Sequence, residues 1–174
     1  MSLSELNTRS SVERAFATYL STVDFGGVSV ANLGGAFLGE ETGVTHPFAI
    51  HVMAGELGEE GELPEEWEQL KLPALVVQSP DSTRHALGYD VCELTLNAMT
   101  TPQEKQAPER TTIRLAWLMS IFDDANLDAL AGTIAELVDG LTIIGIEYIG
   151  DSHQENGRQI MGIVRLRVHA TVTG

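Results

Sequence analysis

The chain has one cysteine, Cys92, and only 6% aromatic residues. A lone cysteine excludes an internal disulfide framework, and no spaced set of cysteines and histidines offers a zinc site. We therefore expect neither a metal nor a cofactor. No run approaches the roughly 18 apolar residues of a membrane-spanning helix, so we expect no membrane partner. Glu5, Arg9, Glu13 and Arg14 fall where a signal peptide would need an apolar core, and we expect no such peptide.

Basic residues are also scarce. Ten Lys and Arg stand against 25 Asp and Glu, which gives a formal net charge of -15. Binding to a phosphate backbone requires Lys and Arg to displace counterions, so this charge argues against direct nucleic-acid binding. It favours solubility, and it favours basic partners or self-assembly through faces that are locally neutral. We expect a soluble protein kept in a reducing compartment.

The length of 174 residues, with 43% hydrophobic content, suits one globular domain. We predict a single domain over residues 1–174. Residues 24–72 form a glycine-rich and acidic insertion in it, with one or two strands. Seven glutamates lie between Glu56 and Glu68; we interpret them as solvated surface, because the spacing of a calcium loop is absent. Pro64 is placed to begin a short helix there.

Three segments favour helices. Apolar residues recur at helical spacing within residues 3–20 and again within 127–138, where Gly140 follows as a terminator. Residues 110–122 fit a helix begun by Pro108, and they also alternate well enough for a strand; we prefer the helix. The two clear stripes consist of Val12, Ala15, Phe16, Tyr19 and Leu20, and of Leu127, Leu130, Ala131, Ile134, Leu137 and Val138.

Four segments favour strands in two hairpins. Residues 74–78 are short, aliphatic and bounded by prolines, and 89–99 alternate between apolar and polar positions. Residues 141–149 and 160–172 form the second pair, joined by a polar turn. The sequence thus predicts an α+β fold. A mostly antiparallel sheet of about four or more strands packs against an N-terminal helix and one or two central helices.

The loop between the first two strands, residues 79–88, gathers reactive side chains. Ser82 could act as a nucleophile near His85, and Arg84 with His85 could bind an anion, which predicts a small hydrolase or anion-binding enzyme as one alternative. The same residue types form good turns, because Pro, Asp and Ser preset or hydrogen-bond the local backbone. We favour a turn in which Arg84 and His85 meet a neighbouring subunit, and a protein that is not an enzyme.

Arg165 and Arg167 lie on one face of the predicted last strand. If this strand lies beside residues 89–99, Glu93 opposes one of the two arginines in an ordinary cross-strand ion pair. The alternative is a basic stripe that meets the acidic surface of a neighbouring subunit. Both interpretations fit the sequence.

The order of the predicted elements resembles a family of phage proteins. A helix, the strand LPALVV, the strand GYDVCELTLNAM, the helical FDDANLDALAGTIAELVDG and a closing IVRLRVHATV resemble the tail terminator and tail-completion proteins, over residues 10–20 and 73–173. The resemblance implies a homo-oligomeric, typically hexameric, ring that completes the tail and contacts tail tube and head-tail connector proteins. It also implies a place in the host cytoplasm during assembly and then in the virion tail or neck. A host adaptor of the same fold is an alternative.

Overall fold

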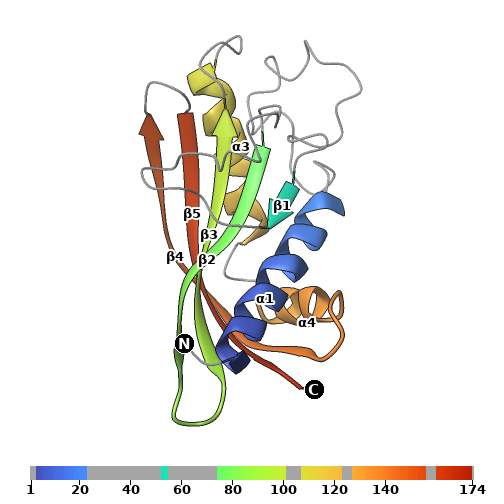
Figure 1. The fold of residues 1–174 in the computed structure, drawn as a ribbon. Coiled ribbons are helices and arrows are strands. Elements are labelled where there is room, and N and C mark those ends of the chain that lie inside the picture. The colour runs from blue at the N-terminus through green and yellow to red at the C-terminus, as the bar shows by residue number, and fades with distance from the viewer. Residues whose placement is uncertain are drawn as a thin grey trace.

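The structure, a computed structural model, describes residues 3–22, 52–54, 74–100, 107–122, 127–155 and 160–173. Within these ranges the chain forms one sheet and three helices, so the predicted α+β class is confirmed (Figure 1). The elements are α1 (Leu3–Thr22), β1 (Val52–Ala54), β2 (Ala74–Arg84), β3 (Asp90–Thr100), α3 (Ala107–Ile121), α4 (Leu127–Ala135), β4 (Leu141–Glu155) and β5 (Ile160–Val172).

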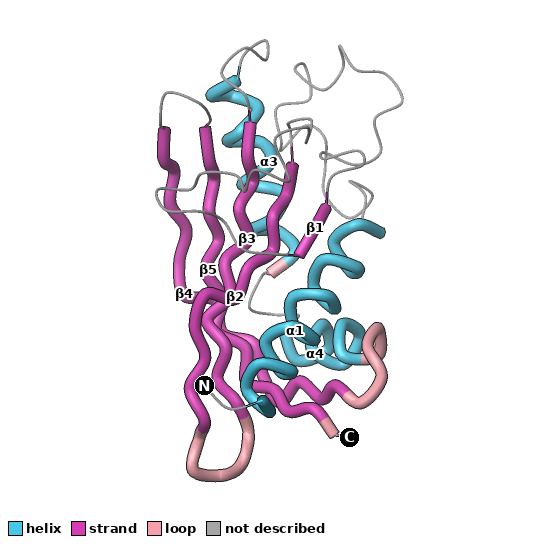
Figure 2. The backbone as a smooth tube through the Cα atoms, viewed as in Figure 1, coloured by secondary structure: helices cyan, strands magenta, loops and turns pink. Residues whose placement is uncertain are grey.

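The sheet has the strand order β1-β2-β3-β5-β4 (Figure 2). β1 runs parallel to β2, and every other pair is antiparallel, so both predicted hairpins are confirmed. β5 enters between β3 and β4, which places Glu93 directly opposite Arg167. The β2–β3 hairpin extends past the first turn of α1 (Figure 1).

All three helices contribute to one hydrophobic core. The predicted stripe of α1 is confirmed, because Val12, Phe16 and Leu20 are fully buried. Trp117 of α3 and Ile134 of α4 join them. The strands supply alternate residues to the same core, as their two-residue period requires. From β3 and β5 these are Cys92, Leu94, Leu96, Ala98, Val164, Leu166, Val168 and Ala170.

Residues 107–121 are helical, so our preference for a helix over a strand is confirmed. The buried side chains of α3 follow helical spacing: Ile113, Trp117 and Leu118 lie in the core. The helix lies close to β5, because a Cβ added at Gly162 would stand only 3.0 Å from the Cβ of Leu115. Glycine at this position therefore lets the helix and the strand approach each other.

The end of α4 was predicted wrongly. The helix ends at Ala135, whereas the apolar stripe predicted helix as far as Val138. The Leu137 N–H donates to the Ile134 carbonyl at 3.1 Å, three residues back, so the final turn is tighter than an α-helix. This tightening rotates Leu137 out of the stripe and leaves it 44% exposed.

The predicted loop at residues 79–88 is also wrong, because β2 continues to Arg84. The pairing register shifts between Gln78 and Asp81, which leaves Ser79 and Pro80 out of the ladder as a bulge. Two side chains of α1 satisfy the backbone hydrogen-bonding groups of Ser79 instead: Arg9 donates to its carbonyl through Nε at 2.9 Å, and Glu13 accepts its N–H at 2.9 Å. A proline that would end a strand is thereby accommodated.

β4 is longer than the predicted 141–149. Two bulges reset its register, one between Ile143 and Gly145 and one between Tyr148 and Gly150, so the strand pairs with β5 as far as Glu155. Of the predicted insertion, the structure describes β1 alone. The other predicted strand of 24–72, the acidic run, its helix and the polar stretch 101–106 lie outside the described residues.

Two glycines, Gly132 inside α4 and Gly140 after its end, give a matched stability test. Gly140 has φ +80°, and an added Cβ would stand 2.6 Å from the Thr173 carbonyl oxygen, whereas nothing lies within 4 Å of a Cβ at helical Gly132. We expect Gly140→Ala to lower the free energy of unfolding by about 2 kcal/mol. Gly132→Ala is expected to raise it by about 0.5–1 kcal/mol. Urea denaturation measures both, and equal effects would contradict the local account.

Candidate functional site

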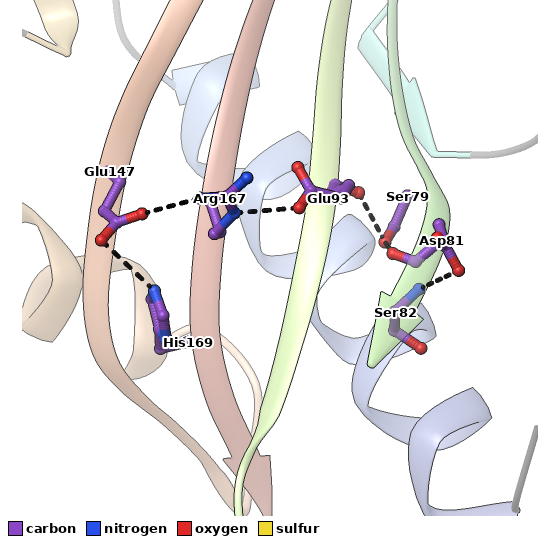
Figure 3. A network of polar contacts seen from close by, with 7 residues as sticks. All are labelled: Ser79, Asp81, Ser82, Glu93, Glu147, Arg167 and His169. Atoms are coloured by element: carbon purple, nitrogen blue, oxygen red, sulfur yellow. Dashed lines mark hydrogen bonds and ion pairs between the residues drawn. The ribbon is translucent and has the colours of Figure 1, made fainter. Parts of the chain in front are cut away.

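A polar network crosses the face of the sheet opposite the helices, which we call the outer face (Figure 3). Arg167 lies at its centre and donates through Nε to Glu93 Oε1 at 2.9 Å and through Nη1 to Glu147 Oε2 at 3.4 Å. His169 Nε2 lies 3.7 Å from Glu147 Oε1. The predicted cross-strand pair of Glu93 with a β5 arginine is confirmed, and the arginine is Arg167.

The ion pairs of this network are exposed. The Arg167 and Glu93 side chains keep 40% and 41% of their surface accessible, so solvent screens their attraction and the pair adds little to stability. The hydrogen bond from Arg167 to Glu93, followed by the charge of Glu93, raises the pKa of the arginine. The network therefore fixes the orientation of charged groups on the outer face more than it stabilises the fold.

Arg165 differs from Arg167 in its surroundings. It faces Thr95 on β3 and Gly150 on β4, and its Nη1 donates to the Ser152 hydroxyl at 3.0 Å. Within the described part of the chain no carboxylate lies within 4.0 Å of its guanidinium. Arg165 is thus a half-buried cation without a direct ion pair among the described residues.

Arg84 and His85 point to different partners. Arg84 Nη1 lies 3.2 Å from Asp90 Oδ1, and the buried Asp90 also accepts the Thr8 hydroxyl at 2.6 Å. The His85 ring stacks on Tyr89 with 4.4 Å between ring centroids. Its Nδ1 accepts the Leu87 N–H at 3.1 Å, while Leu87 itself is 81% exposed at the hairpin tip. The contact of Arg84 with Asp90 therefore joins β2 and β3 next to the turn, and the contacts of His85 order the turn itself.

Ser82 is not brought to His85. It pairs with Cys92, whose side chain lies in the core, and its hydroxyl is buried with no hydrogen-bond partner among the described residues. Its N–H donates to Asp81 Oδ1 at 2.8 Å. The Cys92 thiol is also poorly suited to act as a nucleophile, because burial, followed by the charge of Asp90, raises its pKa to about 12. In the described part of the chain, the Ser82 hydroxyl and the His85 ring that the hydrolase alternative needs together thus form no hydrogen bond.

Sequence reasoning missed Glu147, Ile144 and Ile149. Ile144 and Ile149 are the extra residues at the two bulges of β4, where they are 57% and 45% exposed, and they adjoin Gly145 and Gly150, which lie opposite His169 and Arg165 of the outer face. Both stand in an Ile-Gly pair at a bulge of β4. Isolated glycines within an apolar strand are a signal for bulges and could have located both positions.

Comparison of the chain with protein-family models gives no match, and comparison with curated proteins gives none either. Among the described residues, no group of three or more His, Cys, Asp or Glu could hold a metal ion. No helix of the described ranges is long and apolar enough to cross a membrane.

Proposed function

We propose that this chain is a phage or prophage virion structural protein of the tail or neck. It forms a homo-oligomeric ring that terminates or completes the tail and joins it to the head. The supporting observation is the order of the elements: one N-terminal helix, a hairpin, two helices, and a closing hairpin whose last strand, β5, lies beside β3. This is the order on which the resemblance to tail terminator and tail-completion proteins rests.

The charge of the chain suits a ring through which DNA passes. At a formal net charge of -15, an acidic inner surface repels the phosphate backbone and lets it move without sticking. The partners in this proposal are other copies of the chain, the tail tube protein and the head-tail connector proteins. The protein acts without an active site, in the host cytoplasm during assembly and afterwards in the virion.

The predicted contact residues divide into two groups on the structure. Arg165, Arg167 and Glu93 lie together on the outer face, whereas Arg84 and His85 lie at the β2–β3 hairpin. Because Arg84 also pairs with the buried Asp90, its replacement tests folding as well as assembly. The outer face is therefore the cleaner surface on which to test assembly.

The test is a tail-completion assay. Tail tubes are assembled from purified tube protein, the purified chain is added, and tube length and tube ends are followed by electron microscopy, with native mass spectrometry of the chain alone. We expect closed rings in the mass spectra, ring-shaped density at one end of each tube, and an arrest of tube growth. A chain that stays monomeric and leaves the tube ends bare would refute the proposal.

A further inference from the structure

The outer face carries an exposed isoleucine beside an arginine that has no ion pair among the described residues. Ile144 and Ile149 are exposed on β4, and Gly150, next to Ile149, lies opposite Arg165 in the ladder. We call Ile149 and Arg165 the sheet patch; Ile144 lies farther along β4, beyond the Glu147–Arg167 pair, and does not belong to it. An isolated exposed isoleucine needs no explanation, but Ile149 beside an arginine that has no ion pair within the described ranges forms a surface suited to an acidic, partly apolar partner.

A surface of the opposite character lies at the end of α4. Leu137 is 44% exposed, and exposed Glu136 and Asp139 flank it in the chain. Neither carboxylate forms an ion pair with any residue in the part of the chain that the structure describes. We call Glu136, Leu137 and Asp139 the turn patch. It pairs one apolar side chain with two uncompensated negative charges.

The two patches lie on opposite sides of the sheet. The sheet patch belongs to the outer face, whereas α4 packs with the other helices on the core side, where Ile134 is buried. Two patches that are complementary but different, on opposite sides of one subunit, describe a head-to-tail contact. Such a contact closes into a ring when the rotation between neighbouring subunits permits it.

We propose that the sheet patch of one copy binds the turn patch of a second copy of this chain. The inference rests on the proposed ring, for which it names the contacting surfaces. Leu137 packs against Ile149, and Glu136 and Asp139 neutralise Arg165. Charge favours a second copy as the partner: cations are scarce in this chain, and Arg165 of the sheet patch has no ion pair with any described residue, whereas the turn patch of a second copy offers two carboxylates.

A charge exchange tests the contact. We expect Arg165→Glu to weaken self-association by roughly tenfold or more, because it sets like charges against the turn patch. Glu136→Lys with Asp139→Lys is expected to weaken it similarly. All three changes in one chain should return the dissociation constant to within about threefold of the original, since each contact then regains opposite charges. Sedimentation velocity over a concentration series measures each constant.

A matched control separates the contact from a general effect of added charge. Met119→Glu introduces a carboxylate at an exposed methionine of α3, outside both patches and outside the β2–β3 hairpin, and should change the dissociation constant by less than about twofold. Ile149→Asp introduces the same group within the sheet patch and should weaken association strongly. Thermal unfolding of every variant shows whether the subunit itself stays folded.

Cross-linking tests the pairing directly. A chain carrying both Leu137→Cys and Ile149→Cys should form a ladder of disulfide-linked copies under mild oxidation, while each single variant stays unlinked; the native Cys92 is fully buried. A single variant that links to itself would indicate a two-fold contact and overturn the inference. So would a wild-type oligomer that Arg165→Glu leaves unchanged, although the ring would stand. A monomeric wild-type chain would overturn both proposals.

Discussion

Arg9→Met is expected to lower the free energy of unfolding by about 3 kcal/mol. Arg9 is only 9% exposed, and its guanidinium donates through both Nε and Nη2 to the Ser79 carbonyl at the bulge of β2. Methionine fills a similar volume without donors, so the carbonyl loses these donors and the half-buried Glu13 loses a nearby positive charge. Urea denaturation monitored by circular dichroism measures the loss.

The control for Arg9→Met is Arg14→Met. Arg14 lies on the same helix but is exposed, so its replacement should change the free energy of unfolding by less than about 0.5 kcal/mol. Amide hydrogen exchange gives a second readout, because loss of the Arg9 contact should speed exchange at Asp81–Arg84, the part of β2 beyond the bulge. Equal losses from the two arginines would contradict this role of Arg9.

Trp117→Ala is expected to cost about 3–5 kcal/mol, the largest loss of any single replacement considered. Trp117 has no exposed surface and is the largest fully buried side chain of the described residues. Alanine removes its apolar contacts and leaves a cavity that α3 cannot fill by moving inward, because Leu115 already stands against Gly162 of β5. The cost should therefore lie in the upper part of the range for aromatic truncations.

Met119→Ala is the matched control for this truncation. Met119 lies on the same helix and is 39% exposed, so its replacement should cost under about 1 kcal/mol. Chemical denaturation of both variants at one temperature compares the losses, and the slope of each curve checks that unfolding remains a single transition. Losses of similar size would show that the space around Trp117 collapses after truncation.

The regular parts of the fold follow from the sequence because burial repeats there. Leu94 and Leu96 face the core with a period of two, and the α1 stripe of Val12, Phe16 and Leu20 follows helical spacing. The same alternation set Glu93 and a β5 arginine on one face, so their pairing could be predicted. Its register required the strand order, which local patterns do not contain.

The wrong predictions share one physical cause, since each depends on a contact between distant segments. Pro80 ends a strand by any local rule, yet β2 continues because Arg9 and Glu13 bind the backbone of Ser79 from another element. In the sequence these two residues look like an ordinary helical ion pair at i and i+4. Leu137 continues a helical stripe, and the tightened turn ahead of Gly140 exposes it.

The outer face was predicted only in part for a related reason. Alternation suggested polar, accessible residues along it, but Asn97 and Met99 at one end are almost fully buried. Asn97 satisfies its amide by donating to the Val76 carbonyl at 3.1 Å and to the Thr95 hydroxyl at 3.2 Å. The face is therefore buried at this end and charged around Arg167, a division that the alternating pattern does not reveal.

The two bulges of β4 also protect the protein from aggregation. A long edge strand presents unpaired N–H and C=O groups that can recruit strands from other molecules and grow into fibrils. β4 spans Leu141–Glu155 at such an edge, but its bulges at Ile144 and Ile149 divide it into short regular runs. A foreign strand can pair with only a few residues before the register fails. The exposed isoleucines thus stay available to partners that recognise side chains, without inviting uncontrolled backbone pairing.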